Sequence, residues 1–284
     1  MTEAFTSVAI IGGGFMGAGI AEAAAVSGIR VVVRELPQFL EATRRRLETS
    51  LGRAVVKGKL DAVQRDEALA RITLTSDLND LAGVDLVIEA VSENIEIKTA
   101  IMKELDGIVG EETILASNTS AIPIAQLASV VSHPERVVGL HFFSPVPVMS
   151  LAEIVHALDT SDDTVKKARM FVEQLGKHAI VTKDRSGFIV NFLLVPYLMA
   201  AVRMYEEGFA SREDIDDGMR LGAGHPMGPL TLCDFIGLDV LHAICNSMYD
   251  EFKLTEYAPP PVMKRMIAAG RLGRKSGRGF YNYT

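Results

Sequence analysis

The sequence has few of the features that mark metal, disulfide or membrane proteins. It holds two cysteines, Cys233 and Cys245, in 284 residues. Their spacing fits no metal motif, and two cysteines make no disulfide framework in a chain of this length. No apolar run approaches the ~18 residues of a membrane span. We therefore predict no metal site, no disulfide and no membrane segment.

Excess basic charge and targeting segments are also lacking. The formal net charge is −7, which disfavours general binding to nucleic acid or to anionic membranes. No basic segment followed by a long apolar one precedes "VAIIGGGFMG", so we expect no signal or transit peptide. Apolar residues make up 48% and charged residues 23%, which are globular proportions. These features predict a soluble, cytoplasmic protein.

Short apolar segments alternate with helical patterns over the first two thirds of the chain. The segments "SVAII", "IRVVVRE", "DLVIEA", "ILASN", "RVVGLHFF" and "HAIVT" are typical of buried strands, and helical patterns separate most of them. This alternation predicts an α/β domain with a mostly parallel sheet. From Gly187 onward the patterns are long, apolar and helical, so we predict one α/β domain over residues 1–185 and an all-α domain over residues 186–284.

A glycine-rich turn follows the first predicted strand. "IIGGGFMGAG" contains Gly12-x-Gly14-x-x-Gly17, with Phe15 and Met16 inside the motif. Gly12 permits a tight turn, Gly14 lets the backbone approach a pyrophosphate, and Gly17 allows close packing of helix and strand. The N–H groups at the start of the helix then bind the pyrophosphate. The motif predicts a Rossmann-type dinucleotide site in the N-terminal domain.

The second predicted strand ends at an acidic residue. Glu35 lies 18 positions after Gly17, where a carboxylate can accept hydrogen bonds from the adenosine ribose. A carboxylate there repels a 2′-phosphate, so the sequence favours NAD as cofactor. The neighbouring Arg34 keeps NADP open as the alternative.

Seven stretches together resemble one family, the L-3-hydroxyacyl-CoA dehydrogenases, and bacterial 3-hydroxybutyryl-CoA dehydrogenases most. They are "GGGFMGAGIAEAAA", "VIEAVSENIEIK", "ILASNTSAIPI", "GLHFFSPVPVM", "RSGFIVNFLLVPYL", "LGAGHPMGPLTLCDFIGLD" and "GRKSGRGFYNY". The resemblance implies an N-terminal Rossmann domain and a helical domain that makes a homodimer. It also implies a role in fatty acid metabolism, with NAD-dependent interconversion of (S)-3-hydroxyacyl-CoA and 3-ketoacyl-CoA, the acyl chain being short as in 3-hydroxybutyryl-CoA.

The resemblance also assigns expected roles to single residues. His141 matches the catalytic histidine, Glu153 its glutamate partner, and Ser120 and Asn191 polar residues beside the substrate and the nicotinamide. Besides the glycine turn and Glu35, it implies cofactor contacts for Glu93, Lys98, Ser120, Ser144 and Lys275. It implies acyl-CoA contacts for Ser50, Lys57, Ser120 and Asn191.

The chemistry of the residue types agrees with these roles. Oxidation of a secondary alcohol needs a base near neutral pKa, and histidine is the usual choice. His141 closes a predicted strand, and the carboxyl ends of strands line the ligand crevice of an α/β sheet. By position alone His141 could equally be an interior histidine, Ser120 a turn residue, and Asn191 part of an interhelical hydrogen bond.

The segment 41–60 reverses the sign of the overall charge. It holds six basic residues, Arg44, Arg45, Arg46, Arg53, Lys57 and Lys59, against Glu41 and Glu48. Such a segment suits the phosphates of CoA or the acidic surface of an acyl carrier protein. A solvated helix face is the plainer interpretation.

Two positions depart from the family pattern. Ser144 stands where an asparagine is usual, and Phe192 stands where an arginine commonly follows the asparagine. Both indicate a modified substrate pocket. A dehydrogenase of a carrier-tethered or unusual hydroxyacyl thioester is therefore one alternative, and a dinucleotide-binding protein without catalysis is another.

Overall fold

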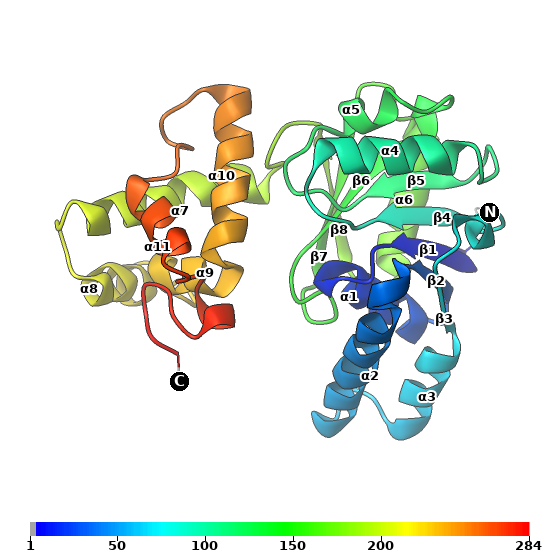
Figure 1. Cartoon of the computed structure of the whole chain (residues 1–284), viewed down its shortest axis with the longest axis horizontal. Coiled ribbons are helices and arrows are strands. Elements are labelled where there is room, and N and C mark those ends of the chain that lie inside the picture. The colour runs from blue at the N-terminus through cyan, green and yellow to red at the C-terminus, as the bar shows by residue number, and fades with distance from the viewer. Residues whose placement is uncertain (1–3, 284) are drawn as a thin grey trace. The chain divides into compact units, whose positions relative to one another are not determined.

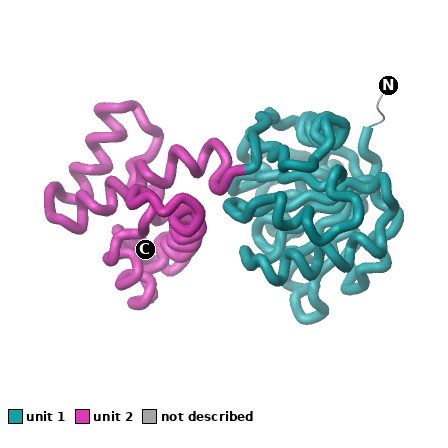
Figure 2. Tube along the Cα trace, turned by 90° about the horizontal axis from the view of Figure 1, so that it is seen from above, with its two compact units in different colours: residues 1–184 teal, residues 185–284 magenta. Residues whose placement is uncertain are grey.

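The computed structural model describes residues 4–283. The chain divides into two compact units, Met1–Asp184 and Arg185–Thr284, coloured teal and magenta in Figure 2. The two units differ in secondary structure: the first contains all of the named strands, and the second is built from helices. The predicted fold class, an α/β Rossmann-type domain followed by an all-α domain, is confirmed.

The first unit is built from eight strands and six α-helices within its described residues (Figure 1). The strands are β1 (Ser7–Ile11), β2 (Arg30–Arg34), β3 (Ile72–Thr75), β4 (Leu86–Glu89), β5 (Ile114–Ser117), β6 (Val137–Phe142), β7 (Leu151–His156) and β8 (His178–Lys183). The helices are α1 (Phe15–Val26), α2 (Leu40–Val56), α3 (Ala62–Ala70), α4 (Ile95–Asp106), α5 (Ile124–Ala128) and α6 (Asp162–Gln174).

The strands form one sheet in the order β3-β2-β1-β4-β5-β6-β7-β8. All neighbouring pairs are parallel except β6 and β7, which are antiparallel. The order of the first six strands is the doubly wound Rossmann order, in which the strand order reverses between β1 and β4. The carboxyl ends of β1, β2, β4, β5 and β6 therefore meet at one edge, where such folds bind their ligands.

Helices cover both faces of this sheet. One core cluster joins alternate strand residues such as Val8 and Ile10 to buried residues of α1, α2 and α6. The buried Met102 and Ile124 of α4 and α5 lie outside that cluster, and Figure 1 shows these two helices grouped apart from α1 and α2. Burial on both faces explains why the strands read as continuous apolar runs rather than as alternating ones.

The second unit contains five α-helices among its described residues: α7 (Val190–Glu206), α8 (Arg212–Asp217), α9 (Pro229–Ile236), α10 (Leu238–Phe252) and α11 (Pro261–Ala268). They pack around one core that includes Leu198, Met199, Leu241 and Tyr257. Within residues 4–283 no single helix has the length and apolarity to cross a membrane, and the bent pair α9–α10 meets those criteria only jointly.

Two elements escaped the sequence patterns. No strand is predicted over residues 72–75, but α3 ends at Ala70 and Ile72 begins β3 at the edge of the sheet. An edge strand of four residues that is only partly buried leaves no continuous apolar run to read. The short helix α5 follows Pro123, which occupies its N-cap position, and five residues are too few for a helical period to show.

Candidate active site

The glycine turn has the geometry that a dinucleotide needs. Gly12 has φ of +95°, a conformation that other residues rarely adopt. A Cβ at Gly17 would lie 1.8 Å from the carbonyl oxygen of Gly12, whereas a Cβ at Gly14 would meet nothing within 4 Å. Gly14 is the N-cap of α1 and no side chain caps that end. The helix start is therefore open for a pyrophosphate, as the motif predicts, and the residues present fit NAD.

Glu35 lies directly beside this turn. Its Oε2 accepts a hydrogen bond from the Gly13 backbone N–H at 2.8 Å, and its Oε1 accepts one from the Leu36 N–H at 2.7 Å. These two contacts hold the carboxylate at the carboxyl end of β2. Phe15, by contrast, is 62% exposed at the first position of α1, and Met16 packs against the core.

Helix α2 supports the other side of the same turn, which the sequence did not reveal. The Arg46 guanidinium donates to the Gly13 carbonyl oxygen at 2.7 Å, and the Thr43 hydroxyl donates to it at 3.1 Å. A Cβ at Gly13 would lie 2.3 Å from the Thr43 side chain. Arg46 is therefore tied to the dinucleotide turn, although the sequence grouped it with the basic residues expected to meet an acidic ligand.

His141 and Glu153 lie opposite each other in the antiparallel pair β6–β7. Nδ1 of His141 is 2.7 Å from Oε2 of Glu153, and their exposed fractions are 4% and 0%. An ionised carboxylate only accepts hydrogen bonds, so Nδ1 carries the proton of a neutral ring, whose lone pair is then on Nε2. The Phe143 ring packs edge-on against the imidazole at 4.6 Å between centroids. The ring is thus held in one orientation and one tautomer.

Ser120 lies in a loop that a carboxylate from the neighbouring strand connection holds. Glu93 Oε1 accepts hydrogen bonds from the Ser120 N–H at 2.9 Å, the Ala121 N–H at 3.2 Å and the Thr119 hydroxyl. Glu93 Oε2 lies 3.3 Å from the ammonium of Lys98. Three residues that the sequence placed at the site separately, Glu93, Lys98 and Ser120, therefore belong to one connected group.

Two further polar residues of this edge were missed by the sequence analysis. Glu89, the last residue of β4, is fully buried and accepts from Lys98 and from the Ser117 hydroxyl. The side chain of Asn118 accepts a hydrogen bond from the Phe142 N–H at 2.9 Å and so links β5 to the residue after His141. The sequence pattern could have identified both residues, since each is a polar residue at the carboxyl end of an apolar strand.

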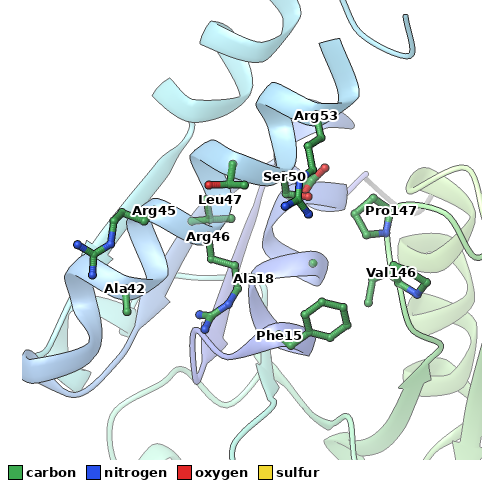
Figure 3. Close-up of a pocket in the computed structure, with 14 residues that line it drawn as sticks. Phe15, Ala18, Ala42, Arg45, Arg46, Leu47, Ser50, Arg53, Val146 and Pro147 are labelled. Carbon is green, nitrogen blue, oxygen red and sulfur yellow. The ribbon is translucent and has the colours of Figure 1, made fainter. Parts of the chain in front are cut away.

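Two adjoining cavities lie between α1, α2 and the loop after β6. Their volumes are about 350 and 380 Å³, and they share Glu22, Ser50, Arg53, Pro145 and Pro147. Figure 3 shows the first cavity, with Arg53 and Ser50 of α2 facing Val146 and Pro147. Lys57 lines the second. Both residues that the resemblance placed at CoA, Ser50 and Lys57, thus lie on one continuous furrow.

A carboxyl group and a buried lysine line this furrow as well. Burial raises the pKa of Glu22, and a hydrogen bond with Ser50 offsets part of that increase. Burial lowers the pKa of Lys177, whose ammonium donates to the carbonyl oxygens of Val146 at 2.6 Å and Met149 at 2.7 Å. Lys177 therefore holds the loop that begins beside Ser144, an exposed residue joined to Pro145 by a cis peptide bond.

The remaining predicted residues belong to the second unit. Asn191 is half-buried near the start of α7. The Lys275 ammonium donates to Asp239 at 2.6 Å. The ring of Phe192 packs against Phe252 and Tyr257, and the guanidinium of Arg185 lies over it, 3.9 Å from the ring centroid. An arginine thus lies next to the position that departs from the expected pattern.

Known proteins share this organisation over the whole chain. The family description "3-hydroxyacyl-CoA dehydrogenase, NAD binding domain" matches residues 7–185, and "3-hydroxyacyl-CoA dehydrogenase, C-terminal domain" matches residues 187–283. The chain is 49% identical to a 3-hydroxybutyryl-CoA dehydrogenase of Mycobacterium tuberculosis over 100% of both chains. It is 42% identical to the mitochondrial hydroxyacyl-coenzyme A dehydrogenase of Homo sapiens over 97% of this chain and 90% of the relative.

A solved structure agrees. The crystal structure of (S)-3-hydroxybutyryl-CoA dehydrogenase from Ralstonia eutropha matches with a TM-score of 0.93 and 45% identity, over 99% of this chain and 100% of the other. The glycine turn, the eight-stranded sheet and these likenesses over both units lead to one conclusion. The chain belongs to the 3-hydroxyacyl-CoA dehydrogenase family, and it is an NAD-dependent oxidoreductase of that family.

Proposed function

We propose that this protein interconverts short-chain (S)-3-hydroxyacyl-CoA and 3-ketoacyl-CoA, with His141 and Glu153 as the catalytic dyad. The observation that carries the proposal is the buried contact between Nδ1 of His141 and Oε2 of Glu153. It lies near the carboxyl end of β6, in a sheet whose first turn fits a dinucleotide. A base in that place meets a ligand that spans the carboxyl edge of the sheet.

The dyad supplies the proton chemistry of the reaction. NAD, held at the glycine turn and Glu35, would supply the acceptor for the hydride that leaves the carbon bearing the hydroxyl group. His141 takes the hydroxyl proton on Nε2 at the same time. Nδ1 cannot take it, because Nδ1 already carries a hydrogen and donates it in a hydrogen bond to the Glu153 carboxylate. The Glu153 carboxylate stabilises the imidazolium that forms. In the reverse direction the imidazolium returns the proton to the ketone oxygen.

Ser120 and Asn191 are proposed to form hydrogen bonds with the oxygen atoms of the substrate. Glu93 accepts a hydrogen bond from the backbone N–H of Ser120. The Ser120 side-chain hydroxyl is the group proposed to donate to the reacting oxygen. Asn191 lies in an otherwise apolar stretch of α7, where an amide needs a polar partner. Together with Glu35 and the glycine turn, Glu93, Lys98, Ser144 and Lys275 are proposed to serve the cofactor.

The furrow between α1 and α2 is the proposed site of the CoA moiety. Ser50 lies where its two cavities adjoin, and Arg53 and Lys57 are on the same helix. The positive charges of Arg53 and Lys57 suit the phosphates of CoA. The furrow is therefore long and basic, as a nucleotide thioester requires.

Assembly and location complete the proposal. We propose a homodimer that forms through the second unit, whose exposed apolar side chains include Leu193, Phe209 and Leu221, at exposed fractions of 67%, 77% and 71%. Apolar surface of this kind is a feature of protein interfaces. Sedimentation of the full chain tests the dimer, and cell fractionation tests the proposed cytoplasmic location.

A chain-length series tests the substrate. NADH absorbance is followed with (S)-3-hydroxyacyl-CoA esters of increasing length, with the (R)-3-hydroxybutyryl ester as stereochemical control, and with the hydroxybutyryl group on an acyl carrier protein. The proposal expects the highest kcat/KM for the short (S)-CoA esters. Turnover of the carrier-bound thioester alone would favour the alternative substrate, and no turnover would indicate a binding protein.

A further inference from the structure

We propose that Lys177 is a positioning residue for the binding of CoA, because its ammonium holds the loop over residues 145–149 that forms one wall of the furrow. The inference rests on the proposed function, since it takes the furrow as the site of the CoA moiety. It gives a role to Lys177, a residue to which the family resemblance assigns none.

The loop over residues 145–149 lines both parts of the furrow. Pro145, Val146 and Pro147 line the first cavity, and Pro145, Pro147 and Val148 line the second. Figure 3 shows Val146 and Pro147 facing Arg53, which lies on α2 at the other side of the first cavity. The position of this loop therefore sets the width of the furrow.

The backbone of Lys177 is fixed on both sides. Lys177 lies in the turn between α6 and β8. Its N–H donates to the Val172 carbonyl oxygen at 3.2 Å, and Gly176 has φ of +70°, a frequent way to end a helix. The next residue, His178, begins β8 and donates its N–H to the Ser150 carbonyl oxygen at 2.6 Å. The side chain of Lys177 thus extends from a rigid base.

The ammonium of Lys177 connects two points of the loop. It donates to the carbonyl oxygens of Val146 at 2.6 Å and Met149 at 2.7 Å. The loop itself closes as a turn, in which the N–H groups of Val148 and Met149 donate to the Pro145 carbonyl oxygen at 2.9 and 3.0 Å. Hydrogen bonds from a charged donor are shorter and stronger than neutral ones. The turn is therefore held as a unit.

The burial of this ammonium separates it from the other cations of the furrow. Lys177 is 9% exposed, burial lowers its pKa, and no carboxylate among residues 4–283 forms an ion pair with it. A buried charge persists only when it is hydrogen-bonded, so the ammonium depends on the two carbonyl groups. Arg53 and Lys57 are exposed, which suits them to contact phosphates directly. Lys177 instead supports the wall.

The consequence is a change in affinity for CoA. Without the ammonium, the carbonyl groups of Val146 and Met149 lose their donor, and the turn is free to leave its position. Binding of CoA must then first order this wall, which costs free energy of binding. The glycine turn and Glu35 belong to other elements, so NAD affinity should not change with it.

The test is Lys177→Met, which keeps an unbranched side chain without the ammonium. The Kd of free CoA is measured by isothermal titration calorimetry and that of NAD by binding fluorescence. We expect the Kd of CoA to rise by about tenfold, with the Kd of NAD changed by less than about twofold. Wild-type CoA affinity in the folded variant, or a loss of NAD affinity alone, would overturn the proposal.

The dependence on salt distinguishes support of the wall from direct contact with phosphate. Screening weakens a direct contact between charges. If Lys177 acts through the loop, the ratio of the CoA Kd values of variant and wild type should be the same at low and at high ionic strength. A ratio that falls toward one at high ionic strength would show direct contact and refute the positioning role.

Two further variants of the same position extend the test. Lys177→Arg keeps a charged donor for the two carbonyl groups, so it should recover most of the CoA affinity. Lys177→Gln replaces Lys177→Met if the latter does not fold. Its amide is one bond shorter and uncharged, so we expect weaker CoA binding than in the wild type. Wild-type affinity in Lys177→Gln would contradict the proposal.

A matched control removes a lysine elsewhere in the first unit. Lys167 lies on α6 and pairs with Asp163 at 2.8 Å, and it touches no proposed site residue. Lys167→Met changes the net charge equally and should leave the Kd of CoA at the wild-type value. An equal loss of CoA affinity in both variants would show an effect of overall charge, and the proposal would fail. Turnover by the wild type is measured alongside, so failure of the proposed function is recognised separately.

Discussion

Glu153 faces His141 directly across the antiparallel pair β6–β7, with 2.7 Å between Oε2 and Nδ1. Glu153→Gln keeps the shape of the side chain and removes the charge that would stabilise an imidazolium. We expect kcat to fall by about 10²- to 10⁴-fold, with NAD affinity unchanged, as measured by NADH formation and by binding fluorescence. Glu173→Gln, an exposed change on α6, is the control, and wild-type turnover in Glu153→Gln would refute the dyad.

The two glycines of the turn should respond differently to the same substitution. A methyl group at Gly14 meets nothing within 4 Å, whereas one at Gly17 would lie 1.8 Å from the Gly12 carbonyl oxygen. We therefore expect Gly14→Ala to keep the unfolding temperature but to weaken NAD binding at least tenfold, because the methyl occupies the place of the pyrophosphate. Gly17→Ala should lower the unfolding temperature.

Thermal unfolding with and without NAD separates these effects. Unimpaired NAD binding in Gly14→Ala would mean that the pyrophosphate does not lie against this backbone. A Gly17→Ala variant as stable as the wild type would contradict the close approach of helix and strand.

Cofactor choice should depend on Glu35. Its carboxylate is fixed by the N–H groups of Gly13 and Leu36, in a position to accept from a ribose and to repel a 2′-phosphate. Glu35→Gln should weaken NAD binding and narrow the ratio of NADP to NAD dissociation constants. Titration of both cofactors measures that ratio, with the exposed Glu41→Gln as control. Tighter binding of NADP by the wild type would overturn the preference for NAD.

The buried cysteines make the second unit sensitive to alkaline pH. Burial raises the pKa of the Cys245 thiol to about 12 and raises that of Cys233 as well. Above a pH of about 9 the thiols ionise in the unfolded chain but not in the folded one. The folded state then binds more protons, so the free energy of unfolding should decrease as pH rises from about 9 to about 12.

Denaturant unfolding at a pH of about 7 and at a pH of about 10 measures this effect. Cys245→Ala removes one of the two thiols, so its loss of stability between the two values should be smaller than that of the wild type. An equal loss in both proteins would show that Cys245 does not contribute. The free thiols should also resist alkylation until denaturant is added.

The sequence predicted the large elements because their physical signals are local. The apolar strands "SVAII" and "DLVIEA" are buried on both faces, and the glycine turn needs residues at fixed spacing. The partly buried edge strand β3 gave no such signal. The contact between Arg46 and Gly13 joins residues 33 apart, and a charge on a helix does not reveal which carbonyl it reaches.

The chemical residues show the same division. The family resemblance predicted the roles of His141 and Glu153. The strand register that sets them opposite each other depends on how the loop between β6 and β7 folds, which the sequence pattern does not show. In the sequence, Glu89 is an acidic residue at the end of an apolar strand. Its partners come from α4 and β5, so its contacts depend on the packing of three elements.

The most direct test compares the wild type with His141→Gln in the oxidation of (S)-3-hydroxybutyryl-CoA, followed by NADH absorbance, with the Kd of NAD measured for both proteins. The account predicts steady NADH formation by the wild type, and a kcat lower by orders of magnitude in the variant at unchanged NAD affinity. No NADH formation by the wild type, or equal turnover in the two proteins, would contradict it.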